Sequence, residues 1–149
     1  GYGGAKFSDF ACYVDRISSP HKTQAVVIFV ANDITGGKDD KSPEEVLKLF
    51  KFSARTIRKN NPSAKIFYIE ITPTPSRWKA WPQIQKANLL IRLYCERQKD
   101  MFFIQTHDRF LDTSGVPEKS LFRDDHLHLN RNGYKLWREI ILNELKKHL

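Results

Sequence analysis

The 149-residue sequence lacks several features that would mark an unusual class of protein. It has only two cysteines, Cys12 and Cys95, which are too few for a disulfide framework. Both lie among apolar residues at helical spacing, which predicts two buried free thiols. No apolar run approaches about 18 residues, so we expect no membrane-spanning helix. Internal repeats and low-complexity stretches are also missing, which excludes a collagen-like architecture. The ordinary globular composition argues against intrinsic disorder.

The chain is basic, but it contains no long run of residues with the same charge. Lysine and arginine total 25 and aspartate and glutamate 17, a net charge of +8. Such an excess is compatible with nucleic acids, anionic surfaces or acidic substrates. The basic residues are, however, scattered among acidic ones. The densest group, residues 146–148, ends a predicted helix, where the helix dipole favours positive charge. We therefore predict no dedicated nucleic-acid binding and keep a basic nucleic-acid-binding domain as a minor alternative.

The length and the composition of the chain indicate one globular domain over residues 1–149. Hydrophobic residues make up 40% and charged residues 28% of the chain. A chain of this size buries roughly 68–70% of its unfolded surface, which suffices for a hydrophobic core.

Helical and strand patterns alternate along the chain, which predicts an α/β layered fold with a parallel sheet. The run 24–31 is continuous, apolar and β-branched, which is typical of a strand buried on both faces. Ser42, Pro43 and Glu45 form the signature of a helix start with a capping box. The predicted strands are 24–31, 66–71 and 101–104, and the predicted helices are 6–17, 43–60, 82–97 and 132–147.

Ligands of open α/β sheets bind beyond the carboxyl ends of the strands, and residues 123–130 are expected there. Asp125 and His128 are separated by two residues. A carboxylate at this spacing can fix the imidazole tautomer and leave the other ring nitrogen free as a base. A solvated polar loop is one alternative. A metal site is another, because Asp124, Asp125, His126 and His128 are all possible ligands, although no further Cys or His cluster supports it.

Two further candidates could stabilise negative charge on a substrate. Asn32 follows the first predicted strand, and its side-chain amide could donate to a developing oxyanion. The alternative is a turn asparagine that caps the loop. Gly1, Gly3 and Gly4 could let a backbone N–H approach a ligand closely, or could simply make a turn.

Together these segments resemble the SGNH, or GDSL-type, hydrolases over essentially the whole chain. The blocks 1–4, 30–33 and 125–128 are similar to three of the family's four blocks, in the same order. Residues 129–130 and 133–134 also look typical of this family, and residues 72–78 look typical of a bacterial subgroup of small esterases within it. The resemblance implies a three-layer α/β/α flavodoxin-like fold with a parallel sheet. It also implies an oxyanion hole from Gly4 and Asn32, and Asp125 and His128 as the acid and base of a catalytic triad.

Two departures from the family pattern change what we expect. Val30 replaces the usual glycine of the third block, which would narrow the cleft or alter the strand end. The first block, Gly-Asp-Ser, which carries the nucleophilic serine, does not occur in the sequence. We therefore expect residues 1–149 to be the larger part of a domain whose N-terminal strand-helix-strand unit is missing. The strand at 25–31 would then be an open apolar edge, completed by the missing segment or by another chain.

The expected function is a serine ester hydrolase acting on a small-molecule or carbohydrate ester, without a metal or an organic cofactor. Arg77, Trp78 and Trp81 are predicted to line the substrate cleft, with packing of the loop onto the domain as the alternative for the tryptophans. The alternative function is a non-catalytic remnant or a binding module with the same fold.

Overall fold

Three short strands form a parallel sheet, and their order in the sheet is their order along the chain. The computed structural model describes residues 3–149. The strands are β1 (Ala25–Ile28), β2 (Lys65–Ile69) and β3 (Met101–Ile104). The helices are α1 (Phe7–Ser18), α2 (Pro43–Asn60), α3 (Trp81–Glu96) and α4 (Arg131–His148), with short 3₁₀ helices η1 (Pro75–Ala80), η2 (His107–Arg109) and η3 (Lys119–Leu121). The predicted alternation of strands and helices is confirmed.

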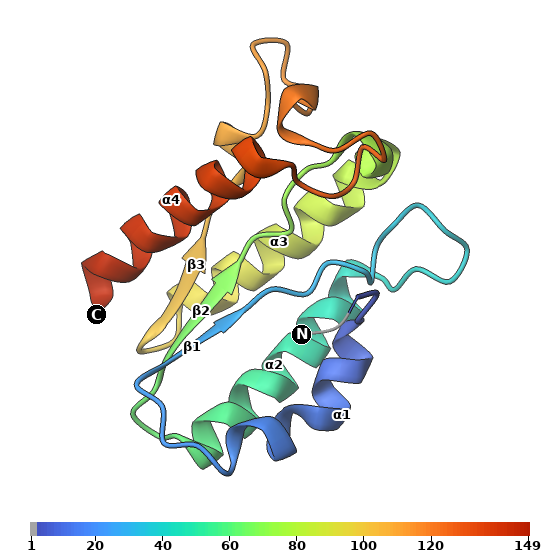
Figure 1. The fold of residues 1–149 in the computed structure, drawn as a ribbon. Coiled ribbons are helices and arrows are strands. Elements are labelled where there is room, and N and C mark those ends of the chain that lie inside the picture. Colours follow the sequence, from blue (N-terminus) through green and yellow to red (C-terminus); the bar gives the residue numbers. More distant parts are fainter. Residues whose placement is uncertain (1–2) are drawn as a thin grey trace.

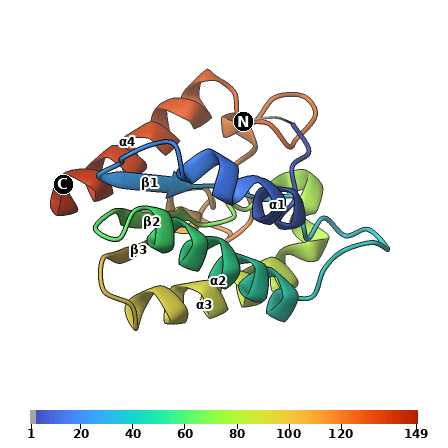
Figure 2. The ribbon, with the colours of Figure 1, turned by 90° about the horizontal axis from the view of Figure 1, so that it is seen from below.

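The helices cover the two faces of the sheet unequally. Helices α1, α2 and α3 lie on one face, and α4 lies alone on the other (Figures 1 and 2). The result is the predicted three-layer α/β/α arrangement. All three strands run in the same direction, so their carboxyl ends meet at one edge of the sheet.

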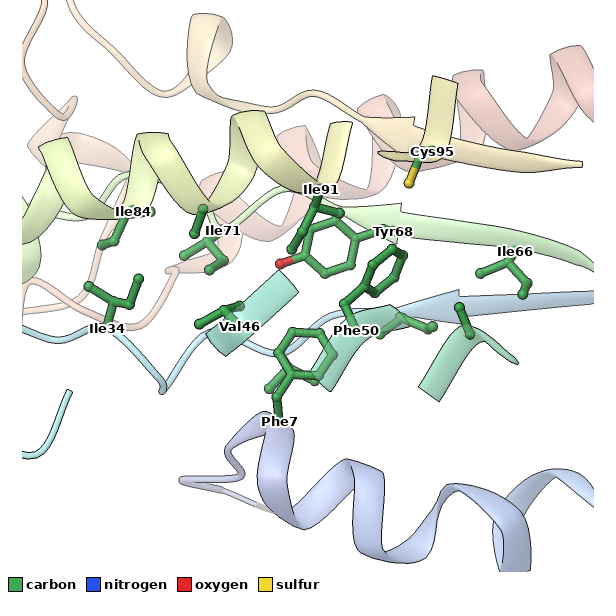
Figure 3. Packing of buried hydrophobic residues seen from close by; sticks show 14 of the residues in the cluster. Phe7, Ile34, Val46, Phe50, Ile66, Tyr68, Ile71, Ile84, Ile91 and Cys95 are labelled. Atoms are coloured by element: carbon green, nitrogen blue, oxygen red, sulfur yellow. The ribbon is translucent and has the colours of Figure 1, made fainter. Parts of the chain in front are cut away.

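The larger core lies between the sheet and the three-helix layer (Figure 3). Tyr68 from β2 points into this layer, where it packs against Phe7 of α1 and Phe50 of α2. All three side chains are fully buried. Burying an aromatic or a large aliphatic side chain contributes about 1.5–3 kcal/mol each, so this contact region fixes the three helices against the sheet.

The second core, under α4, is smaller and leaves β1 partly uncovered. Phe67, Ile69 and Ile104 pack against apolar residues of α4. Val27 and Phe29, on the same side of β1, are each 44% exposed. The prediction of a strand buried on both faces is therefore wrong for β1 in the described chain. The reason is that α4 packs mainly over β2 and β3, and its Trp137 meets Phe29 just after the end of β1.

Local signals set the helix ends, as the sequence predicts. The capping box of α2 is confirmed: the Ser42 hydroxyl accepts from the Glu45 backbone N–H at 3.2 Å, and the Glu45 carboxylate accepts from the Ser42 N–H at 2.8 Å. The 3₁₀ helix η1 begins at Pro75, between the predicted strand 66–71 and the predicted helix 82–97. Proline suits a first helical turn because backbone N–H groups have no intrahelical acceptor there, so the lack of an N–H loses no hydrogen bond.

The two cysteines differ in their surroundings. Cys95 is buried as predicted, but Cys12 is exposed, so the prediction of two buried thiols is wrong. Helix α1 turns Phe7 and Val14 towards the core, and Cys12 lies on its outer face. Between Gly3 and Leu149, no helix is both long and apolar enough to cross a bilayer.

Candidate active site

A cleft of about 410 Å³ opens beyond the carboxyl ends of β1 and β2. This volume lies in the range of small-molecule sites, about 300–1,000 Å³. Four segments far apart in the sequence meet there. The predicted site residues that line the cleft are Gly4, Asn32, Arg77 and His128.

Asp125 and His128 form a hydrogen-bonded pair at the cleft. The distance from His128 Nδ1 to Asp125 Oδ2 is 2.8 Å. The other carboxylate oxygen accepts the backbone N–H groups of Leu127 and His128, each at 2.9 Å. The hydrogen bond from the His128 side chain and these two backbone bonds hold the pKa of Asp125 well below its usual range. An ionised carboxylate only accepts, so Nδ1 carries the proton and Nε2 of neutral His128 is left as a base.

The turn that carries this pair is fixed by backbone hydrogen bonds. The Arg123 N–H donates to the His128 carbonyl at 2.8 Å. His126 adopts a left-handed conformation, with φ of 55°, at the tip of the turn. Its carbonyl accepts the Ser76 N–H at 3.0 Å, which joins this turn to η1. Across residues 3–149, no three His, Cys, Asp or Glu side chains are grouped so that they could hold a metal ion.

Asn32 and Asp33 fasten the glycine-containing segment to the end of β1. Asn32 Nδ2 donates to the Ala5 carbonyl at 3.0 Å, and Asp33 accepts the Phe7 N–H at 2.8 Å. Asp33 is buried and forms an ion pair with Lys41 at 2.9 Å. Gly4 is thereby held next to Asn32, and its φ of 76° suits a glycine.

Arg77 contacts the same strand end from the opposite side. Its Nη1 donates to the Ala31 carbonyl at 2.6 Å, and its Nη2 donates to Asn32 Oδ1 at 2.7 Å. Burial lowers the pKa of Arg77 from its ordinary value, but arginine remains charged at neutral pH. A guanidinium, a side-chain amide and an imidazole therefore face one cleft.

The sequence of residues 1–136 matches the model of the GDSL-like lipase/acylhydrolase family. The chain belongs to this family. Among proteins of curated function, none matches the sequence significantly.

Solved structures of esterases have the same fold as this GDSL-like chain. A family 3 carbohydrate esterase from Talaromyces cellulolyticus has a TM-score of 0.82 and 18% identity, with 99% of this chain and 69% of that chain covered. A GDSL-like lipase from Bacteroides thetaiotaomicron has a TM-score of 0.79 and 18% identity, with coverage of 98% and 73%. The esterase domain of the ORF1 protein from the zebrafish ZfL2-1 retrotransposon has a TM-score of 0.61 and 27% identity, with coverage of 97% and 85%.

Trp78 and Trp81 of the GDSL-like chain do not line the cleft. Trp78 and Trp81 stack with ring centroids 5.9 Å apart. Trp81 is 5% exposed and belongs to the core. Neither tryptophan is among the residues that line the cleft, whereas Val30 is, with its side chain buried. The placement of the two rings favours packing of the loop over contact with a substrate.

Several cleft residues were not nominated from the sequence. Phe29 and Trp137 meet edge to face at 5.1 Å and form an apolar wall. Thr72 and Tyr134 add hydroxyl groups. Tyr134 and Trp137 lie in the first two turns of α4, directly after the turn of His128, so their closeness to His128 in the sequence was the available signal.

A buried carboxylate behind the cleft was also missed. Glu70 is 4% exposed and accepts the backbone N–H groups of Thr106 and His107 at 2.7 Å and 2.8 Å. His107 Nδ1 lies 2.9 Å from the same carboxylate. The signal was a glutamate within an apolar strand, because a buried charge requires partners.

Proposed function

We propose that this GDSL-like chain carries the acid–base pair and the oxyanion hole of a serine ester hydrolase. The observation that carries the proposal is that His128, hydrogen-bonded to Asp125, and Asn32 line the same cleft. In this arrangement His128 Nε2 is the base and Asp125 orients the ring. The backbone N–H of Gly4 and the side-chain amide of Asn32 donate to the oxyanion.

The proposed reaction is an acyl transfer in two halves. A serine hydroxyl attacks the ester carbonyl and gives its proton to His128 Nε2, and the carbonyl oxygen becomes an oxyanion. His128 then returns the proton to the leaving alcohol as the C–O bond breaks. In the second half, water attacks the carbonyl of the acyl-enzyme and gives a proton to His128, which returns that proton to the serine oxygen as the bond between the acyl group and the serine breaks and the carboxylic acid leaves.

The nucleophile in this proposal comes from outside residues 1–149. No serine lies among the described residues that line the cleft, whose hydroxyls are those of Thr72, Thr74 and Tyr134. The sequence contains no Gly-Asp-Ser segment. An ester of a small molecule or a carbohydrate is the substrate class supported by the similarity to the carbohydrate esterase.

Replacement of the base tests the assignment. In the full-length protein, His128→Ala is expected to lower kcat/KM for p-nitrophenyl acetate by about 10²–10⁴-fold or more, since it removes general acid–base catalysis. The matched control is His126→Asn, which removes a neighbouring exposed imidazole and tolerates the left-handed backbone. The control is expected to retain its activity. Full activity in His128→Ala would overturn the proposal, and an inactive parent protein would favour a binding module instead.

A further inference from the structure

Arg77 is half-buried, and its guanidinium donates hydrogen bonds to uncharged acceptors. Two of its nitrogens donate to the Ala31 carbonyl and to Asn32 Oδ1, at 2.6 Å and 2.7 Å. No ion pair found within residues 3–149 includes it. Its backbone, with φ of −108° and ψ of 15°, departs from helical values inside η1. The guanidinium of Arg77 therefore binds the segment that carries Asn32, the candidate oxyanion donor, and not an acidic side chain.

These contacts decide which way the Asn32 amide points. A side-chain amide has an accepting oxygen at one end and a donating nitrogen at the other, and arginine can only donate. Oδ1 must therefore face Arg77, and Nδ2 must face the other way. There Nδ2 donates one hydrogen to the Ala5 carbonyl at 3.0 Å, which agrees with the same orientation. No bond within residues 3–149 uses the second N–H of Asn32, and Asn32 lines the cleft where a ligand would bind.

The guanidinium also changes the strength of this donor. A cation bonded to an amide oxygen polarises the amide, and hydrogen bonds in such a chain strengthen one another. A fixed positive charge near a developing oxyanion acts more strongly in a partly buried site than in water. Both effects grow as negative charge develops, so they act on the transition state more than on the bound ester.

We propose that Arg77 is a positioning residue for ester hydrolysis, which holds Asn32 with an amide N–H directed at the oxyanion. This inference rests on the proposed function and assigns a residue that acts through the oxyanion hole rather than on the substrate. The loss of Arg77 should therefore lower kcat and leave KM nearly unchanged.

The test combines single and double variants of the full-length protein with p-nitrophenyl acetate. Arg77→Met retains most of the side-chain length and removes the donors, and is expected to lower kcat about 10–100-fold, as misplaced catalytic groups do. Asn32→Ala is expected to lower kcat about 10²–10³-fold, the usual cost of one oxyanion donor. The double variant should be no slower than Asn32→Ala, because Arg77 acts through Asn32.

Arg58 provides a matched control. Its guanidinium also donates to backbone carbonyls, those of Pro62 and Lys99 at 3.0 Å and 3.1 Å, but at the opposite end of the sheet. Arg58→Met should lower stability without lowering kcat, and Arg77→Lys should restore little, because an ammonium cannot reproduce the two-pronged contact. Additive losses in the double variant, or a rise in KM alone, would overturn the proposal and indicate direct contact of Arg77 with the substrate.

A second measurement separates this inference from the proposed function. Ester turnover by the parent protein tests the function. The orientation of Asn32 is tested without turnover, from its side-chain ¹⁵N–¹H₂ resonances, which are identified by their loss in Asn32→Ala. Arg77→Met should shift this resonance pair, and Arg58→Met should not. An unshifted pair in Arg77→Met would overturn the positioning role even in an active enzyme.

Discussion

Gly133 lies in the first turn of α4 at a point where the chain approaches itself closely. A Cβ at this position would lie well inside van der Waals contact with the backbone carbonyl oxygen of Leu121. It would also lie 3.1 Å from the side chain of Leu129. The same carbonyl accepts the Asn130 N–H at 3.0 Å. Gly133→Ala therefore has to push apart the start of α4 and the loop that carries His128.

Two effects of this substitution oppose one another. Helix propensity alone favours alanine over glycine by about 1 kcal/mol. Overpacking against backbone costs about 1–3 kcal/mol, and loss of the bond between Asn130 and Leu121 costs about 0.5–1.5 kcal/mol more. The packing cost wins, so we expect the free energy of unfolding to fall by about 1–3 kcal/mol, which lowers Tm by about 2–12 °C.

Urea unfolding of Gly133→Ala measures this change. The matched control is Asn132→Ala, which gains helix propensity at the neighbouring exposed position without a close contact. The control should be as stable as the parent or slightly more stable. A Gly133→Ala protein at least as stable as the parent would refute the argument that close backbone approach requires this glycine.

Three further changes test other parts of the structure. Burial raises the pKa of Cys95 to about 12, so iodoacetamide at pH 8 should modify Cys12 but not Cys95 in the native protein, and both in denaturant. Rapid modification of Cys95 in the native protein, read by peptide mapping, would contradict this. The pKa of Asp125 is lower in the fold than its ordinary value of 3.8, so its contribution to stability is present above about pH 4 and is lost as the pH falls further. The stability difference between the parent and Asp125→Asn should therefore shrink below pH 4, and a difference that grows there would contradict this direction. Glu70→Ala leaves the backbone N–H groups of Thr106 and His107 without an acceptor, and should lower the free energy of unfolding, measured in urea, by about 3–5 kcal/mol. A loss under about 1 kcal/mol would show that these bonds stabilise the fold little.

The sequence predicted the features that depend on neighbouring residues. The start of α2 follows from Ser42 and Glu45, three residues apart, and both capping bonds form. Asp125 and His128 are equally close in sequence, so their pairing in one turn could be anticipated. The order of strands and helices followed from periodicity, which is a local property.

Features that depend on contacts between distant segments were not predicted from the sequence, or were predicted wrongly. The second face of β1 was expected to be buried, but what covers it depends on where α4 packs, about a hundred residues later. The bond between Arg77 and Asn32 joins residues 45 apart, and no local pattern predicts it. The exposure of Cys12 depends on which face of α1 packs against the rest of the fold, and the apolar residues next to Cys12 in the sequence do not show which face that is.

The origin of the nucleophile is the central claim of the proposed mechanism. The most direct measurement is the intact mass of the full-length protein before and after a fluorophosphonate, followed by peptide mapping of the adduct. The account predicts one adduct, on a serine outside residues 1–149, that forms much more slowly in His128→Ala than in His126→Asn. An adduct on a serine within residues 1–149, or no adduct at all, would contradict the account.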